Sequence, residues 1–185
     1  GEFQSISSIP GMQERTILVD GVSKTYAMTG WRIGYASNPV LAPYFSTLVT
    51  NTESCAGHVN QYAALEAITG PQDTSVQMAK IFHKRRDIIV DGLNEIDGFS
   101  CLRPGGAFYV WPNVTEACKM VGAANSEALR KRLLYEAHVA VLADIHFGPQ
   151  VAGEGEHLRF SYASSEQDIR KGLEKIREFM AANKK

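Results

Sequence analysis

The spacing of apolar residues along the chain predicts a mixed fold of helices and strands. The longest periodic segment covers residues 74–96, where apolar side chains recur every three or four positions and charged side chains lie between them. Gly98 follows this segment and is typical of a helix end. Further helices are predicted at residues 39–48, 58–68, 126–135 and 166–180, and strands at residues 16–20, 32–36, 99–102, 107–112, 139–142 and 158–162.

The arrangement of these elements changes along the chain. Residues 16–20 form a continuous apolar run rather than an alternating one, which predicts a buried strand of a parallel sheet and an α/β fold for the front of the chain. After residue 98, strands and helices are mixed without strict alternation, which is typical of an α+β domain. We expect a domain boundary near residues 71–74, just after the turn signal Gly70-Pro71.

Composition narrows the possible classes of protein. The 185 residues include 19 basic and 20 acidic side chains, so no general attraction to nucleic acid or to an anionic membrane is expected. Hydrophobic residues make up 44% of the chain and charged residues 21%, a globular balance, and no apolar run approaches the ~18 residues that span a bilayer. Cys55, Cys101 and Cys118 suggest neither a disulfide framework nor a metal site, so we expect reduced thiols, no bound metal and a cytoplasmic location.

Two cations stand close together after the first predicted strand. Lys24 lies on a turn after a predicted strand, where α/β sheets place ligands. A lysine that is partly desolvated at such a place is a candidate for Schiff-base chemistry. The alternative is an ordinary solvated loop lysine. Arg32 stands between Trp31 and Ile33, and its planar guanidinium suits a phosphate or a carboxylate. A structural ion pair with an aspartate or glutamate is the alternative for this arginine.

The sequence around these cations resembles a known family. Ser-Lys-Thr at 23–25, followed by Met-Thr-Gly-Trp-Arg-Ile-Gly-Tyr at 28–35, is similar to the lysine signature of class I/II aminotransferases, the aspartate aminotransferase-like enzymes of fold type I that use pyridoxal 5′-phosphate. Downstream, Pro-Gly-Gly-Ala-Phe-Tyr at 104–109 resembles the turn and strand that open the family's small domain. Gly-Glu-Gly-Glu-His-Leu-Arg-Phe-Ser-Tyr-Ala at 153–163 resembles its carboxylate-binding strand.

The resemblance implies roles for individual residues. Lys24 would be the catalytic Schiff-base lysine, Arg32 would hold the cofactor phosphate with help from Ser23, and Arg159 would bind the substrate carboxylate. Its apolar neighbours Leu158 and Phe160 alone predict that Arg159 lies on the opposite face of a half-buried strand. The alternative for this residue is therefore an ordinary arginine exposed to solvent.

The resemblance also implies how the chain is organised. Residues 1–72 would be the C-terminal piece of a large α/β cofactor-binding domain, and residues 73–185 the linking helix and an α+β small domain. Several parts of the family's site, including the acidic partner of the pyridine nitrogen, precede the lysine by more residues than are present here. We therefore expect the C-terminal fragment of a longer enzyme, inactive by itself.

The implied activity is transfer of an amino group between an amino acid and a 2-oxo acid, by an enzyme that is a homodimer when intact. Two alternatives stay open at this point. One is a pyridoxal phosphate-dependent lyase or synthase of the same fold, and the other is a non-catalytic module that acts by association.

Overall fold

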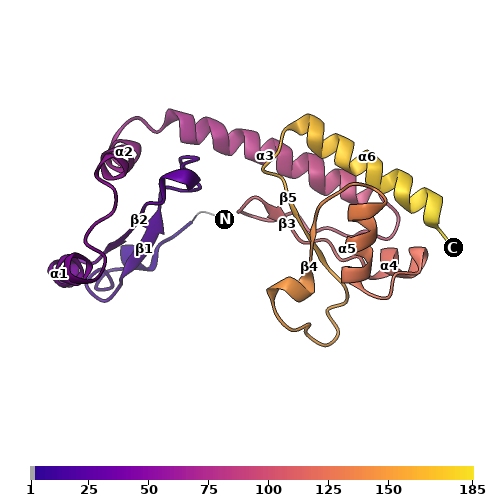
Figure 1. Ribbon diagram of the computed structural model, residues 1–185, viewed down its shortest axis with the longest axis horizontal. Helices are drawn as coiled ribbons and strands as arrows, with labels where there is room; N and C mark the ends of the chain where they lie inside the picture. Colours follow the sequence, from indigo (N-terminus) through magenta and orange to yellow (C-terminus); the bar gives the residue numbers. More distant parts are fainter. Residues whose placement is uncertain (1–2) are drawn as a thin grey trace. The chain divides into compact units, whose positions relative to one another are not determined.

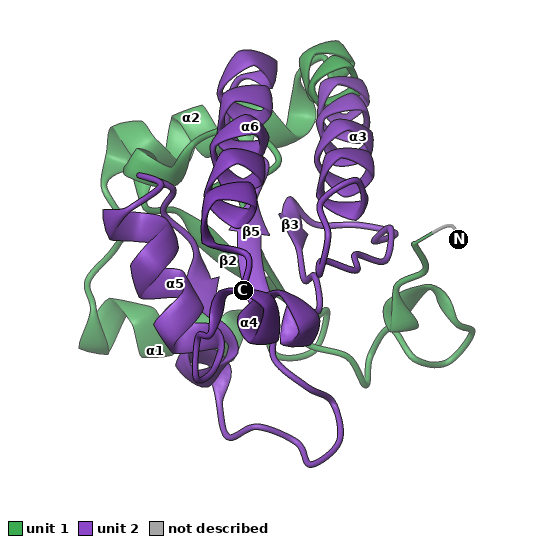
Figure 2. Ribbon diagram, turned by 90° about the vertical axis from the view of Figure 1, so that its right-hand side faces the viewer, with its two compact units in different colours: residues 1–78 green, residues 79–185 purple. Residues whose placement is uncertain are grey.

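The computed structural model describes residues 3–185, which divide into two compact units (Figure 2). The first unit ends at Met78 and the second runs from Ala79 to Lys185, so the division falls inside the longest helix. In chain order the elements are η1 (Ile6–Ser8), β1 (Leu18–Gly21), η2 (Thr29–Trp31), β2 (Gly34–Ser37), α1 (Ala42–Thr52), α2 (His58–Thr69), α3 (Asp73–Asn94), β3 (Tyr109–Val110), α4 (Thr115–Val121), α5 (Ser126–Tyr135), β4 (Leu142–Ala143), η3 (Asp144–Phe147), β5 (Leu158–Ser161) and α6 (Glu166–Asn183) (Figure 1).

In the first unit, β1 and β2 form a two-stranded antiparallel sheet. Leu18 pairs with Ser37 at one end and Gly21 pairs with Gly34 at the other. The prediction of a buried parallel strand at residues 16–20 is therefore wrong, and Val19 is 76% exposed. Residues 22–33 contain only turns and the short η2, and a connection without a crossover helix returns the chain antiparallel to the strand it leaves.

One buried amide fixes the chain at the far end of this sheet. Asn38 is 3% exposed, and its Nδ2 donates to the carbonyls of Glu14 (3.0 Å) and Thr16 (2.8 Å). Its Oδ1 accepts from the backbone N–H groups of Val40 (2.9 Å) and Leu41 (2.8 Å). The side chain thus uses its full hydrogen-bonding capacity to join the approach to β1 with the entry to α1.

Helices α1 and α2 leave much of their apolar surface open in the first unit. No residue of α1 is buried, and Ala64 is the buried residue of α2. Large side chains that are more than half exposed on these two helices are Tyr44, Leu48, Val59, Tyr62 and Leu65. By itself this unit therefore buries little of its apolar area.

The second unit is built on a three-stranded antiparallel sheet with strand order β3-β5-β4. Along β5, Leu158 and Phe160 are buried whereas Arg159 is half-buried, so one face of the sheet meets the core and the other is open. The core packs the inner face against helices α3 to α6 and contains, among others, Val90, Leu93, Val110, Val121, Leu129, Leu133, Leu158, Phe160, Leu173 and Ile176.

Helices α3 and α6 lie side by side and run in the same direction (Figure 1). Lys84 pairs with Glu166 (2.9 Å) at the start of α6. About three turns further along, Arg177 of α6 pairs with Glu95 (3.1 Å), the residue just after α3. Between these ion pairs, Gly92 leaves the space that the side chain of Leu173 occupies.

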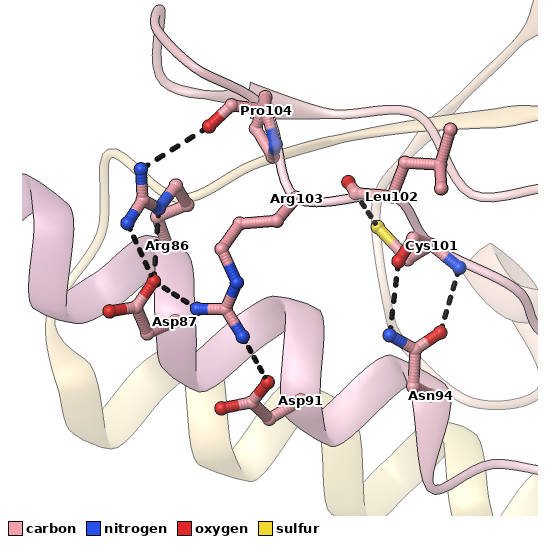
Figure 3. Close-up of polar contacts among 8 residues, drawn as sticks. All are labelled: Arg86, Asp87, Asp91, Asn94, Cys101, Leu102, Arg103 and Pro104. Atoms are coloured by element: carbon pink, nitrogen blue, oxygen red, sulfur yellow. Dashed lines mark hydrogen bonds and ion pairs between the residues drawn. The ribbon is translucent and has the colours of Figure 1, made fainter. Parts of the chain in front are cut away.

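A polar network holds the loop that follows α3 against the helix (Figure 3). Arg86 Nε donates to Asp87 Oδ1 (3.0 Å), and its Nη1 donates to the carbonyl of Pro104 (3.3 Å). Arg103 binds both Asp87 and Asp91, at 2.6 Å to the latter. The neighbouring Arg86 and Arg103 guanidinium groups lower the pKa of Asp87, which keeps this carboxylate charged.

Most predicted helices are confirmed, but short elements differ. The helix expected to reach residue 96 ends at Asn94, before Gly98 with its φ of +87°. The strand predicted at residues 99–102 is wrong, since only an isolated bridge joins Ser100 to Asn113 there. The predicted strand at 107–112 shrinks to Tyr109–Val110, and that at 139–142 moves to Leu142–Ala143. Helix α4 was not predicted, because its seven residues span barely two turns and begin without a side-chain cap.

Candidate functional site

Lys24 and Arg32 lie on one loop whose two ends are joined by β1 and β2. Lys24 comes three residues after Gly21, and Arg32 comes two residues before Gly34. Beyond the paired glycines, the N–H of Val22 donates to the carbonyl of Ile33 at 3.4 Å. The ladder therefore brings both ends of the loop together, although eight positions separate the two cations in the sequence.

The turn that carries Lys24 is wound tightly by backbone hydrogen bonds. The N–H of Met28 donates to the carbonyl of Ser23 (3.0 Å), and that of Ala27 to the carbonyl of Lys24 (3.2 Å). The Lys24 side chain is exposed, and among residues 3–185 its amine has no ion pair or hydrogen bond. Ser23 beside it is half-buried. The amine is thus presented on a rigid backbone and open to a reactant.

Arg32 adopts a conformation that is uncommon for a residue with a side chain. It ends η2 in the left-handed region, with φ 53° and ψ 49°, and its Nη1 donates to the carbonyl of Thr29 at 2.9 Å. The guanidinium is exposed, and within the described residues no carboxylate pairs with it. Among residues 3–185 the ion pair considered as an alternative is therefore not formed, and the remaining N–H donors of Arg32 have no partner there. Strained backbone of this kind is often found at functional sites.

Side chains distant in sequence hold this loop in place. Asn60 of α2 donates to the carbonyl of Trp31 (2.9 Å). Ser75 near the start of α3 donates to the carbonyl of Thr25 (3.3 Å), and Tyr26 donates to Gln72 (3.1 Å). Sequence reasoning missed Asn60 and Ser75, because nothing in their local pattern signals a contact with a loop thirty to fifty positions away.

Arg159 belongs to the second unit and lies on the open face of its sheet. Its guanidinium carbon lies 4.2 Å from the centre of the Tyr109 ring and 4.4 Å from that of Phe147. Within residues 3–185 no carboxylate and no hydrogen-bond acceptor contacts the guanidinium. Stacked guanidinium groups keep their N–H edges free, so this arrangement suits a planar anion such as a carboxylate.

Further aromatic side chains extend this face beside Arg159. The Trp111 ring stacks on His157 at 5.7 Å with an interplanar angle of 10°, and meets Phe147 edge-on at 5.4 Å. Tyr109 lies on β3 and Trp111 directly follows the strand, two positions later in the sequence. Phe147 could not be anticipated there, since it lies on the short η3 rather than on a strand.

The sequence of the chain matches a family of known proteins. The chain matches the family of class I and II aminotransferases over residues 1–176. It belongs to that family. The aspartate aminotransferase of Geobacillus stearothermophilus is 38% identical over 174 residues, which cover 94% of this chain and 43% of that protein.

Solved aminotransferase structures have the same fold. The aspartate aminotransferase from Rhizobium meliloti superposes with a TM-score of 0.81 and 37% identity, covering 93% of this chain and 43% of that one. The aromatic aminotransferase from Pyrococcus horikoshii gives 0.83 and 31%, covering 98% of this chain and 47% of that one. The α/β piece followed by an α+β domain is thus confirmed as the C-terminal part of the aminotransferase fold, and the chain spans under half the length of these relatives.

Two general findings complete the description of the site. Within residues 3–185, no helix combines the length and the apolarity needed to cross a membrane. In the same residues, no group of three or more His, Cys, Asp or Glu side chains is arranged to hold a metal ion.

Proposed function

We propose that this chain is the C-terminal part of a pyridoxal phosphate-dependent aminotransferase that moves an amino group between an amino acid and a 2-oxo acid. The family match over residues 1–176 carries the proposal. In it, residues 1–72 form the end of the large cofactor-binding domain, and residues 73–185 form the linking helix and the small domain. Neither the lyase alternative nor the association module has support from the named relatives.

The residues of the β1–β2 loop fit pyridoxal phosphate by their chemistry. The free, exposed Lys24 amine suits an aldehyde, and the exposed Arg32 guanidinium, which lacks an acidic partner among the described residues, suits a phosphate. Ser23 would add a hydroxyl donor to the phosphate. When bound, the cofactor supplies an electrophilic carbon and a ring that withdraws electrons from the substrate α-carbon.

The chain's own residues would then bind, orient and move protons. Lys24 would accept the proton from the substrate α-carbon and return a proton to the neighbouring cofactor carbon, as general base and acid. Arg159 would hold the carboxylate that amino acids and 2-oxo acids share, which fixes the α-carbon for that transfer. The names of the relatives make L-aspartate the first amino donor to test.

We further propose that the activity needs more protein than this chain contains. The exposed apolar side chains on α1 and α2 of the first unit would be covered by the remainder of the longer protein, which we expect to be a homodimer. The chain alone should bind the cofactor weakly and show no transamination. The cytoplasmic location stays a prediction.

The decisive experiment uses the complete coding sequence that contains this chain. The purified protein is incubated with pyridoxal phosphate, reduced with borohydride and digested, and its modified peptide is located by mass spectrometry. Label at Lys24, with oxaloacetate formed from L-aspartate and 2-oxoglutarate, is the expected result. Lys24→Ala should abolish both, whereas Lys80→Ala, on the exposed side of α3, should change neither.

The outcomes separate the proposal from its rivals. Label elsewhere, or no transamination with any amino acid offered, would overturn the aminotransferase proposal. Release of ammonia in place of a new amino acid would favour the lyase. Sedimentation of the complete protein as a monomer would contradict the homodimer, and full transamination by residues 1–185 alone would contradict the need for further chain.

A further inference from the structure

We propose that Asp144 is a positioning residue for Arg159: its carboxylate fixes the η3 turn so that Phe147 lies against the guanidinium and holds the N–H edge ready for the substrate carboxylate. The inference rests on the proposed function, because that function gives Arg159 its ligand. It adds a residue outside the loop that carries Lys24 and Arg32, on a turn that lies far from both of them in the sequence.

The two rings at Arg159 come from different sides of its strand. Tyr109 lies on β3 and Phe147 on η3, which directly follows β4, and β5 runs between β3 and β4. Tyr109 is held by the ladder, where it pairs with Ser161. Phe147 has no strand partner, so its position depends on whatever fixes η3.

Asp144, the first residue of η3, supplies that fixation. The residue is 9% exposed, and its Oδ1 accepts from Ser126 Oγ at 2.6 Å and from the N–H of Ile145 at 2.7 Å. Oδ2 accepts from Gln150 Nε2 and from the N–H of His157, each at 3.0 Å. One carboxylate thus receives four hydrogen bonds and joins the start of α5, η3, the loop after it and the segment entering β5.

The network reaches Arg159 through the backbone as well. The N–H of Asp144 donates to the carbonyl of His157 at 3.1 Å, so Asp144 and His157 are bonded in both directions. His157 stands two residues before Arg159 on the same side of the chain, and its ring stacks on Trp111, which meets Phe147. Asp144 is therefore bonded both to the turn that carries Phe147 and to the segment that leads into Arg159.

The charge state of Asp144 supports a permanent structural carboxylate. Burial alone would raise its pKa, but the donors Ser126, Gln150 and the N–H groups of His157 and Ile145 outweigh burial and lower the pKa overall. Ionised and fully hydrogen-bonded, this carboxylate has no need of Arg159 as a partner. The guanidinium is left for an external anion.

The first test follows Arg159 directly in residues 1–185, without cofactor or substrate. Ring currents of Tyr109 and Phe147 should shift the Arg159 Nε–H resonance, which is assigned by its loss in Arg159→Lys. Asp144→Asn is expected to move this resonance toward its position in an unfolded arginine, and Phe147→Leu to move it in the same direction. Asp97→Asn, an exposed aspartate paired with Lys184, is the matched control and should leave it unchanged.

The second test separates positioning from a general loss of structure. The complete protein is mixed in single turnovers with L-aspartate or with β-alanine, which is aspartate without its α-carboxylate. Asp144→Asn should lower the second-order rate constant for L-aspartate by roughly tenfold or more, since a misplaced binding group costs at least that much. The second-order rate constant for β-alanine should stay within about twofold of the wild-type value. Equal losses with both amines would overturn the proposal.

The outcomes distinguish this inference from the proposed function. An unchanged Arg159 resonance in Asp144→Asn overturns the positioning role whatever the enzyme does. A second outcome is that the Arg159 resonance loses its shift in Asp144→Asn while the wild-type complete protein shows no transamination. This outcome refutes the proposed aminotransferase activity and supports the positioning of Arg159 by Asp144. Should Asp144→Asn fail to fold, Ser126→Ala removes one of the four donors and should change both readouts in the same direction by less.

Discussion

Asn94, the last residue of α3, holds the backbone of Cys101 by two hydrogen bonds (Figure 3). Its Nδ2 donates to the Cys101 carbonyl at 3.0 Å, and the Cys101 N–H donates to its Oδ1 at 2.8 Å. Cys101 is buried, so its backbone groups need partners, and in the absence of a strand ladder one amide side chain supplies both.

Replacing Asn94 with Asp should destabilise the second unit in a pH-dependent way. At pH 7 the new carboxylate oxygen faces the Cys101 carbonyl, and we expect a loss of about 2 kcal/mol in the free energy of unfolding. The repulsion raises the folded-state pKa of the new carboxyl, so stability should recover as the pH falls to about 4 and below, where a protonated carboxyl can donate. Urea unfolding at both pH values measures this. Asn94→Ala, which cannot donate at any pH, is the control and should show no recovery; equal behaviour of the two variants would contradict the interpretation.

The three thiols should differ sharply in reactivity. Cys55 is exposed, whereas burial raises the pKa of Cys101 to about 11 and that of Cys118 to about 12. At pH 8 the thiolate fraction of either buried residue is then about 0.001 or less. Iodoacetamide should label Cys55 in the native chain, and Cys101 and Cys118 only in denaturant, as peptide mass spectrometry would show. Cys55→Ser should abolish native labelling, and labelling of Cys118 at the rate of Cys55 would refute its burial.

Two helical glycines should respond to alanine with opposite signs. A Cβ on Gly92 would lie 2.4 Å from Leu173 Cδ1, whereas a Cβ on Gly172 would meet nothing within 4 Å. Gly172→Ala should stabilise by about 0.5–1 kcal/mol through helix propensity. Gly92→Ala gains the same propensity but forces α3 and α6 apart, with a net loss of about 1–2 kcal/mol. Thermal unfolding measures both, and stabilisation by Gly92→Ala would show that the two helices do not pack as closely as described.

Glu127 should add stability that disappears in acid. Its hydrogen bonds from Arg130, followed by the charges of Arg130, Lys131 and His146, lower its pKa to about 2. A lowered carboxyl pKa means that the stabilisation is complete above about 4.5 and is lost as the pH falls toward 2. Since its side chain is 21% exposed, Glu127→Gln should cost only about 1 kcal/mol at pH 7 and progressively less in acid. Glu116→Gln, with a side chain 67% exposed, is the control. A constant cost across this range would contradict the role of charge.

The spacing of apolar residues and the capping residues predicted the helices well, because these depend on interactions between residues close together in the sequence. Helix α5 begins at Ser126 and ends at Tyr135 as its spacing indicates, and α6 begins after the cap that Ser165 forms with the N–H of Asp168. The strands were less predictable, because their length and direction depend on partners elsewhere in the chain. The apolar run at residues 16–20 has the composition of a buried strand, yet β1 pairs antiparallel with β2 and Val19 is exposed.

The same distinction applies to the candidate site. Lys24, Arg32 and Arg159 could be proposed as site residues from sequence because each cation stands in a recognisable motif. The residues that contact these cations or their loops could not be, since Asn60, Asp144 and Phe147 make contacts that no short segment encodes. In the sequence, an aspartate on a four-residue turn looks like an ordinary loop residue, because its four hydrogen-bond donors come from other segments or from the backbone.

The β1–β2 ladder, which pairs Gly21 with Gly34, fixes the two ends of the loop between them. A residue inserted between positions 24 and 32 would leave the paired ends intact but would change the distance between the Lys24 amine and the Arg32 guanidinium. In the proposed site, where Lys24 and Arg32 bind the same molecule, the length of this loop would limit the size of that molecule more than the composition of the loop does.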